Sequence, residues 1–419
     1  MAEKLGGCGK KTSLLVEPFR PEYGEMISQP DNQVTYFART NHRNAGKPFG
    51  IKRADRRNHM YVIGKTGTGK STLLKTLISQ DIAAGEGLAL FDPHGDLVEE
   101  VAALVPESRQ RDLIYLNVPD HSMKWHFNPF AGVPAERRAL AAAGTVEVFK
   151  KLWPDEWGPR LEHLLRNVAF TLLETQGSTF ADISRLLLDR KYREAVAGRL
   201  SNAVVREFWE KEFAGYSPAF RAVVTAPLLN KLGGFLSDPR LHAILSGKES
   251  SFDLRGVMDE GKILLVNLAK GRIGEGPAAL LGSLLVSHLS LGGLGRADQT
   301  QEKRRDFYLY LDEFQTFATL TLATMLSELR KYRLSLVLSH QYLSQLETEV
   351  RDAVFGNVGT FIAFRVGALD APTVARELAP VFEAADLLSL PNFSIYLRLM
   401  IDGEPSRAFS GSTVDVPKS

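Results

Sequence analysis

The chain has 419 residues, 44% of them hydrophobic and 24% charged, a composition typical of an ordered globular protein that excludes a disordered one. Because 51 basic residues nearly balance 49 acidic ones, no overall charge demands a polyanionic partner, and any surface for one must be local. The single cysteine, Cys8, excludes an internal disulfide and a cysteine-rich zinc site, and the length predicts two or three domains.

Residues 1–57 are predicted to form a lead-in segment, rich in turn-forming residues, with one or two strands. The segment contains no apolar run of signal-peptide length. Apolar stretches later in the chain, at 262–269 and 280–291, are shorter than the roughly 20 residues that a membrane span needs. We therefore expect a cytoplasmic protein that reaches a membrane only through a partner.

The end of this segment is strongly basic, with only one acid, Asp55, among its charged residues. Two interpretations stay open: a solvated lead-in to the core, or a surface that contacts phosphates. The basic residues are Arg39, Arg43, Lys47, Lys52, Arg53, Arg56 and Arg57.

A first α/β block, residues 58–131, follows this segment. It opens with a strand at 59–63, a glycine-rich turn at 64–70 and an amphipathic helix at 71–85. The run GKTGTGKS at 64–71 fits the pattern G-x-x-x-x-G-K-[ST] without deviation, in the strand–turn–helix context that this motif requires. We therefore interpret it as a phosphate-binding loop (P-loop).

The chemistry of this loop predicts a nucleoside triphosphate site. Glycines allow successive N–H groups to converge on phosphate oxygens, and the helix N-terminus adds partial positive charge. Lys70 is predicted to contact the β- and γ-phosphates, and the hydroxyl of Ser71 to bind Mg²⁺. The predicted nucleotide-binding residues are Gly64, Lys65, Thr66, Gly67, Thr68, Gly69, Lys70, Ser71 and Thr72.

Residues 132–250 read as helix after helix and predict an all-α insertion domain that interrupts the α/β core. Here Trp153, Trp157 and Arg160 indicate a packed core, with base stacking or phosphate binding as the alternative.

Earlier, in the first α/β block, Asp92, His94 and Asp96 lie at and after the end of a strand at 87–92. They indicate a turn in which Asp96 caps the next helix, with a metal site as the alternative.

Strands and helices alternate again from 251 to 419, so this block should complete one mostly parallel sheet flanked by helices. Its apolar strand 308–311 ends on Asp312 and Glu313. The carboxyl ends of parallel strands share one sheet edge, where ligands bind. Asp312 is therefore predicted to hold the Mg²⁺ bound by Ser71, and Glu313 to orient and polarise an attacking water.

Two further features of this block bear on hydrolysis. Gln341 follows the strand 334–340 and is predicted to sense the γ-phosphate or the water, with an ordinary loop glutamine as the alternative. Arg330 and Arg333 lie before that strand. Each is either a salt-bridged surface residue or an arginine finger that reaches a neighbouring subunit's site.

Together these stretches resemble the HerA/FtsK superfamily of ring-forming DNA-pumping ATPases, and most strongly the soluble motor of type IV coupling proteins of the TraG/TraD kind and HerA-like relatives. The resemblance covers roughly residues 50–410 and rests on HMYVIGKTGTGKSTLL, ALFDPHGD, DEWGPRLEHLLRN, GKILLVNLAKGRIGE, YLYLDEF and LRKYRLSLVLSHQ. It implies a RecA/ASCE-like P-loop NTPase fold, ATP and Mg²⁺ as cofactors, and a hexameric ring with DNA in its channel.

The resemblance also implies site roles: Lys70 and Ser71 for nucleotide and Mg²⁺, Asp312 for the metal and Glu313 as catalytic base. Gln341 matches the sensor position and Arg330 the arginine finger, which favours Arg330 over Arg333. The chain differs from membrane-anchored coupling proteins in showing no transmembrane helix, and its first 57 residues are short for the β-barrel of HerA proper.

Three functions are therefore compared. The first is an ATP-driven DNA translocase of the coupling type, working with a relaxase or secretion channel. The second is a regulatory ATPase that assembles a nuclease or effector partner in DNA processing or defence. The third, a P-loop phosphotransferase, is disfavoured because Glu313 would activate the water that such an enzyme must exclude.

Overall fold

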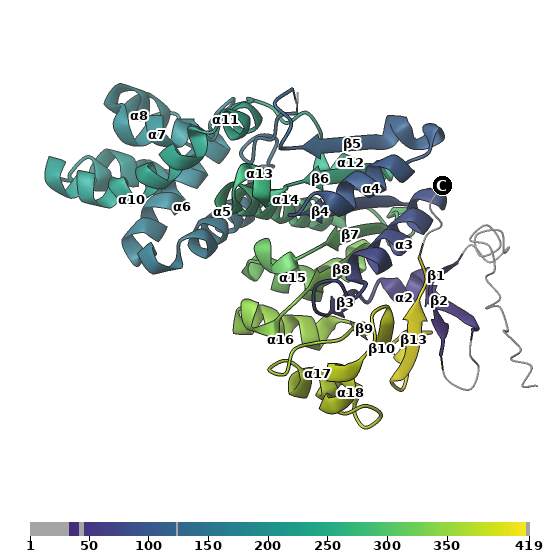
Figure 1. Ribbon diagram of the computed structural model, residues 1–419. Helices are drawn as coiled ribbons and strands as arrows, with labels where there is room; N and C mark the ends of the chain where they lie inside the picture. The colour runs from purple at the N-terminus through teal and green to yellow at the C-terminus, as the bar shows by residue number, and fades with distance from the viewer. Residues whose placement is uncertain (1–32, 42–45, 123–124, 416–419) are drawn as a thin grey trace, which may run out of the picture.

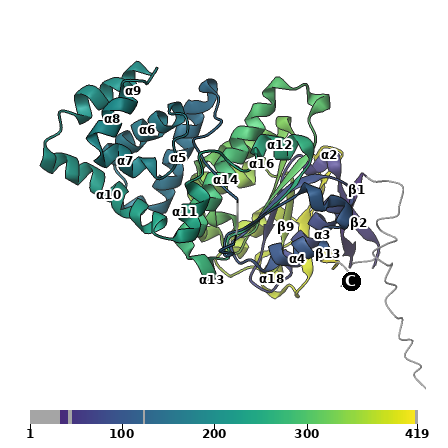
Figure 2. The ribbon, with the colours of Figure 1, turned by 90° about the horizontal axis from the view of Figure 1, so that it is seen from above.

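The computed structural model describes residues 33–41, 46–122 and 125–415, so Cys8 and Arg43 lie outside it. These residues form a broad twisted sheet covered by helices on both faces, with a lobe of helices projecting to one side (Figures 1 and 2). The P-loop NTPase fold class is confirmed: a mostly parallel sheet, flanked by helices and interrupted by an all-α segment.

The main sheet has eleven strands in the order β2-β1-β13-β10-β9-β3-β8-β7-β4-β6-β5. From β9 to β5 all neighbours are parallel, whereas β2, β1, β13 and β10 form an antiparallel extension. The strands are β1 (Val34–Thr40), β2 (Pro48–Lys52), β3 (Met60–Ile63), β4 (Gly87–Asp92), β5 (Leu113–Asn117), β6 (Ile263–Asn267), β7 (Phe307–Leu311), β8 (Leu334–His340), β9 (Thr360–Ala363), β10 (Ser394–Arg398) and β13 (Phe409–Thr413).

Successive side chains of a strand enter different hydrophobic cores, because they point to opposite faces of the sheet. On β3, Met60 and Val62 pack with one core and Tyr61 and Ile63 with the other. Helices α3 and α4 cover the first face, and α14, α15 and α16 the second. The helices that flank the sheet are α2 (Arg53–Arg56), α3 (Lys70–Ala83), α4 (Asp96–Leu104), α12 (Leu254–Glu260), α13 (Lys270–Ile273), α14 (Glu275–Gly295), α15 (Leu320–Glu328), α16 (Thr348–Asn357), α17 (Ala371–Leu378) and α18 (Ala384–Ser389).

Between β5 and β6 the described residues form helices joined by loops, with no strand among them, and most of this segment forms the projecting lobe (Figure 2). Helix α5 packs against α14 and so joins this lobe to the sheet. The boundaries 132 and 250 stay a prediction. Apart from two short 3₁₀ turns, the helices of this segment that precede α12 are α5 (Arg138–Leu152), α6 (Pro159–Glu174), α7 (Asp182–Leu188), α8 (Arg190–Ala197), α9 (Ala203–Glu207), the π-helical η4 (Phe208–Phe213), α10 (Pro218–Leu236) and α11 (Pro239–Leu245).

Among the described residues, one helical stretch, Glu275–Asp298, is long and apolar enough to cross a membrane by length and composition, and it is longer than the apolar run seen in the sequence. Its most apolar window is 78% buried inside the protein. The stretch consists of α14 and the turn after it, and α14 lies against the sheet, so its apolar surface is already used by the core.

The basic stretch near residue 50 is largely paired within the chain. Arg56 is buried and forms a bidentate ion pair with Asp81, while its guanidinium lies 3.7 Å from the ring centroid of Tyr308. Three more of these residues pair with carboxylates: Lys52 with Asp402, Arg53 with Glu86 and Arg57 with Asp306. The three arginines are buried or half-buried in these pairs, which favours packing against the core over a phosphate-contacting surface, whereas the pair of Lys52 with Asp402 lies in solvent.

Candidate nucleotide site

The P-loop and the acid pair, far apart in sequence, lie at the same edge of the sheet. Strand β8 lies between β3, which leads into the P-loop, and β7, which ends in the acid pair. Ile63 is in register with His340, and Leu311 with Leu338. The residues that follow all three strands therefore meet at one edge.

The P-loop has the backbone shape that an anion cradle requires. Gly67 and Gly69 have φ of +75° and +118°, which side chains disfavour. Lys70 begins α3, is buried, and its ammonium donates to the carbonyls of Gly64 and Lys65 at 2.7 and 3.3 Å. Burial lowers the pKa of Lys70, and the carboxylates of Glu313 and Asp312 oppose that shift.

A chain of side-chain hydrogen bonds joins this loop to Glu313. Thr66 Oγ1 donates to Gln341 Oε1 at 2.7 Å, and Gln341 Nε2 donates to Glu313 Oε1 at 2.5 Å. Gln315 Nε2 donates to the other oxygen, Oε2, at 2.9 Å. Glu313 itself is buried and holds a left-handed conformation, φ +46°, of the kind that concentrates at functional sites. The three strand ends are thus linked through polar side chains.

Asp312 lies in an acidic and buried setting. Burial, together with the nearby carboxylates of Asp92 and Glu313, raises the pKa of Asp312 to about 7. A cation bound beside these carboxylates would offset their repulsion and favour the ionised form of Asp312. From the sequence, Asp92 was considered only in an alternative metal site with His94 and Asp96; its place beside Asp312 was not predicted, although the end of β4, next to β7, would have indicated it.

These residues fit a nucleotide with Mg²⁺. The exposed Ser71 lies at the N-terminus of α3, beside the buried ammonium of Lys70, and Asp312 supplies a carboxylate. Within the described ranges no group of three His, Cys, Asp or Glu could hold a metal ion by itself. That donor set suits Mg²⁺, which in proteins takes one or two carboxylates and completes its shell with phosphate oxygens and water.

The turn after β4 is built differently from the sequence interpretation. Asp92 accepts the backbone N–H groups of His94 at 2.8 Å and Val98 at 3.0 Å, whereas Asp96 is the first residue of α4. The capping carboxylate is therefore Asp92, and the assignment to Asp96 is wrong. Helix α4 begins only four residues after the last residue of β4, so the carboxylate of Asp92 itself reaches an N–H group at the start of the helix. The alternative metal site is also not formed within the described residues.

The aromatic side chains of the insertion belong to its packing. Trp153 lies 5.0 Å from Phe149 and 5.6 Å from Phe235 between ring centroids. Trp157 Nε1 donates to Glu162 Oε2 at 3.1 Å. Arg160, the third residue of that prediction, lies 5.6 Å from the ring centroid of Phe220. For the two tryptophans these contacts favour the core interpretation over base stacking.

Arg330 lies far from the acid pair of its own subunit. It is exposed on the 3₁₀ turn η8 (Leu329–Tyr332), which leads into the amino end of β8, whereas Gln341 follows the other end. Seven strand residues at about 3.3 Å each separate the two ends by roughly 20 Å. Its charge instead acts on His59, at the amino end of β3. Arg333, by contrast, is half-buried.

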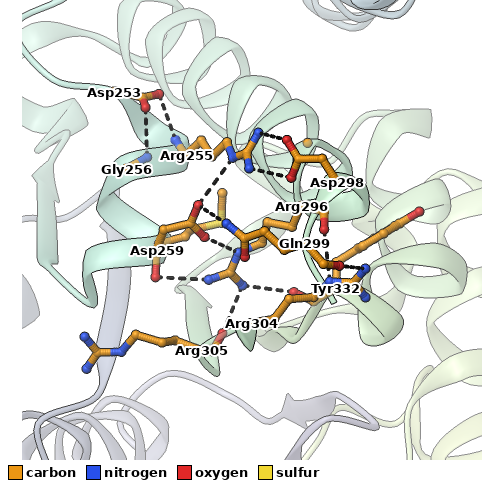
Figure 3. A network of polar contacts seen from close by, with 12 residues as sticks. Asp253, Arg255, Gly256, Asp259, Arg296, Asp298, Gln299, Arg304, Arg305 and Tyr332 are labelled. Atoms are coloured by element: carbon orange, nitrogen blue, oxygen red, sulfur yellow. Dashed lines mark hydrogen bonds and ion pairs between the residues drawn. The ribbon is translucent and has the colours of Figure 1, made fainter. Parts of the chain in front are cut away.

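The turn that carries Arg330 is held by a partly buried network of polar contacts (Figure 3). Arg296, fully buried, pairs with Asp259 at 2.7 Å and donates to the carbonyls of Tyr332 and Arg305 at 2.9 and 3.0 Å. Arg304 Nη1 donates to the carbonyl of Lys331 at 2.6 Å. Both residues that follow Arg330 are thereby tied to the segment between α14 and β7.

Comparison with known proteins identifies the family. The model of the type IV secretion-system coupling protein DNA-binding domain matches residues 44–374. The chain belongs to this family. The sequence resemblance to type IV coupling proteins is thereby confirmed. A search of curated proteins found no match.

Solved structures of the coupling-protein TrwB share the fold. The unbound bacterial conjugative coupling protein TrwBΔN70 matches with a TM-score of 0.62 and 19% identity, over 94% of this chain and 90% of that one. TrwB in complex with ADP and Mg²⁺ matches with a TM-score of 0.60 and 19% identity, over 95% and 93%. VirB4 of Thermoanaerobacter pseudethanolicus matches with a TM-score of 0.57 and 13% identity, over 92% and 98%.

Proposed function

We propose that this coupling-protein family member is a Mg²⁺-dependent ATPase that moves DNA through an oligomeric ring in conjugative transfer. The observation that carries the proposal is the chain from Thr66 through Gln341 to Glu313, which joins the P-loop to the acid pair at one sheet edge. The description of the matching family, a DNA-binding domain of a coupling protein, supports DNA as the substrate of the motor.

Each side chain has a defined task in this proposal. Lys70 and the loop N–H groups bind the triphosphate, and Ser71 and Asp312 hold Mg²⁺. Bound Mg²⁺ supplies positive charge that offsets the charge developing on the phosphate oxygens. Glu313, positioned from both sides by Gln341 and Gln315, orients and polarises the attacking water. Gln341 contacts both the loop and Glu313, so it can report the state of the nucleotide to the base.

A ring would complete the site. Arg330 is exposed and lies roughly 20 Å from its own Gln341, so as an arginine finger it would act on a neighbouring subunit's nucleotide. An arginine finger of this kind neutralises transition-state charge and makes hydrolysis depend on assembly. We expect the ring to be a hexamer and to lie in the cytoplasm. A relaxase or secretion-channel partner would bring it to the membrane.

The decisive experiment compares the ATPase rates of the wild-type protein and Glu313→Gln, with and without single- and double-stranded DNA. We expect DNA to stimulate the wild-type rate. Glu313→Gln should bind ATP and hydrolyse it about a hundredfold or more slowly, because it lacks the base. Near-normal turnover in Glu313→Gln would remove the proposed base, and rates indifferent to DNA would favour the regulatory ATPase. Omitting Mg²⁺ should abolish turnover.

A further inference from the structure

A short loop, residues 390–393, lies directly against the P-loop. The backbone N–H of Phe393 donates to the carbonyl of Thr68 at 2.8 Å. Arg365 donates to the carbonyl of Leu390 at 3.1 Å and to Asn392 Oδ1 at 2.8 Å, and its own carbonyl accepts the N–H of Lys65 at 2.8 Å. The P-loop and this loop are therefore fixed to each other at both ends.

Phe393 is held in an unusual state within this loop. Its φ is +63°, a left-handed conformation that is uncommon for a bulky side chain and that concentrates at ligand clamps. The residue is 49% exposed, although the neighbouring Phe364 is fully buried. Packing alone does not account for a phenylalanine whose backbone is left-handed and whose surface is half in solvent.

The ring lies on the P-loop itself. A Cβ added to Gly69 would lie 2.9 Å from Cδ1 of Phe393 and 3.1 Å from Cε1 of Phe364. Glycine at position 69 thus serves two needs: a φ of +118° and room for two aromatic rings. The next residue is Lys70, so the exposed part of the Phe393 ring borders the predicted phosphate cradle.

The sheet order gives the direction in which a nucleotide must lie. Phe364 directly follows β9, and Phe393 directly precedes β10, on one side of β3. Gln341 and Glu313 follow β8 and β7, on the other side. A nucleotide whose terminal phosphate meets Glu313 therefore extends its sugar and base away from the acid pair, toward Phe393.

We propose that the Phe393 ring is the stacking platform for the nucleobase of the nucleotide held by the P-loop. The inference rests on the proposed nucleotide-binding function and adds a residue for the base. Stacking on an aromatic face is tolerant of base identity, because every base has a π-face. The platform therefore selects nucleotides over bare polyphosphate and discriminates weakly between ATP and GTP.

The test is isothermal titration calorimetry of the full chain with Mg²⁺ and either ATP or tripolyphosphate, which has no base. Phe393→Asn removes the ring, and asparagine tolerates the left-handed conformation. We expect this variant to bind ATP roughly 5- to 150-fold more weakly while its affinity for tripolyphosphate stays unchanged. Phe220→Asn, which removes a partly exposed aromatic ring on α10, is the matched control and should leave both affinities unchanged.

Two results would overturn the platform. One is a wild-type protein that binds ATP no more tightly than tripolyphosphate. The other is a Phe393→Asn variant that keeps the full wild-type preference for ATP. Should Phe393→Asn not fold, Phe393→Gly serves the same purpose, since glycine adopts positive φ freely. Failure of both ligands to bind the wild-type protein would instead refute the proposed function itself.

Discussion

Lys151 Nζ donates to the backbone carbonyl of Gln315 at 2.5 Å. Lys151 is on α5, the helix that joins the lobe to the sheet, and Gln315 holds Glu313. Burial lowers the pKa of Lys151 to about 7, so its ammonium gives up much of its hydration to make this contact. The helical lobe is thus connected to the predicted catalytic base through the side chains of Lys151 and Gln315.

Lys151→Met should uncouple the helical lobe from the predicted catalytic base, Glu313. Methionine fills the space but leaves the Gln315 carbonyl without its donor, so Glu313 loses part of its support. We expect kcat to fall about tenfold or more, with KM for ATP little changed because the P-loop is untouched. Steady-state ATPase assays measure this. Lys150→Met, at the exposed neighbouring position, is the control, and equal rates in both variants would contradict the prediction.

Gln341→Ala should separate nucleotide binding from hydrolysis. The substitution removes both the acceptor for Thr66 and the donor to Glu313, whereas Lys70 and the loop backbone remain. We expect hydrolysis at least about tenfold slower with ATP affinity nearly unchanged, measured by single-turnover kinetics and equilibrium binding. Gln345→Ala, exposed on the turn that follows, should behave as wild type. A parallel loss of affinity would show that Gln341 mainly binds ground-state nucleotide.

Mixing experiments can test whether Arg330 acts between subunits. Arg330→Ala keeps an intact acid pair, and Glu313→Gln keeps an intact arginine, so each alone should be nearly inactive. A mixture of the two variants should regain activity, because some subunit interfaces then combine an intact Glu313 from one subunit with an intact Arg330 from its neighbour. Lys331→Ala, which removes a surface ion pair with Glu328, is the control. A mixture no more active than its separate components would argue against action in trans.

Acid should destabilise the protein through its buried histidines. His59 Nδ1 accepts the N–H of Leu336 while Nε2 faces the Leu326 carbonyl, so the neutral ring satisfies both contacts, and burial lowers its pKa to about 4. Between pH 6.5 and 4 the unfolded state binds the additional proton, and stability falls as the pH falls. His59 alone should account for a loss on the order of 3 kcal/mol.

Urea denaturation across this pH range measures the effect. His59→Gln should flatten the pH dependence of the unfolding free energy, even though it lowers stability at neutral pH. His121→Gln, at an exposed position, should leave the pH dependence as in the wild type. An unchanged slope in His59→Gln would assign the acid sensitivity to other groups, such as His340, whose pKa burial lowers to about 3.

Much of the site could be predicted because its signals are local. A strand, a glycine-rich turn and a helix follow one another around Lys70, and their bounds agree with the structure within two residues. The acid pair was recognisable because an apolar strand ends on two charges, which is costly without a partner. The turn at Asp402 and Gly403, both with positive φ, was also predictable from its residues.

Other features depend on contacts between distant segments. The place of β1 and β2 in the main sheet follows from the pairing of β1 with β13, near the other end of the chain. Phe393 belongs to no recognisable sequence motif. Only the fold shows that it lies beside Thr68 and Gly69 of the P-loop. From the sequence alone Arg56 is indistinguishable from a surface charge. In the structure it is hydrogen-bonded to Asp81 and Tyr310. Composition and periodicity do not encode such partners.

The order of strands also constrains how the protein is made. The strand that leads into the P-loop is synthesised early, but its two neighbours in the sheet, β8 and β9, are not complete until Ala363 has left the ribosome. Until then an apolar strand of the nascent chain lacks both partners, a state prone to aggregation. We expect the helical segment between β5 and β6 to fold first, and chaperones to protect the unpaired strands while translation proceeds.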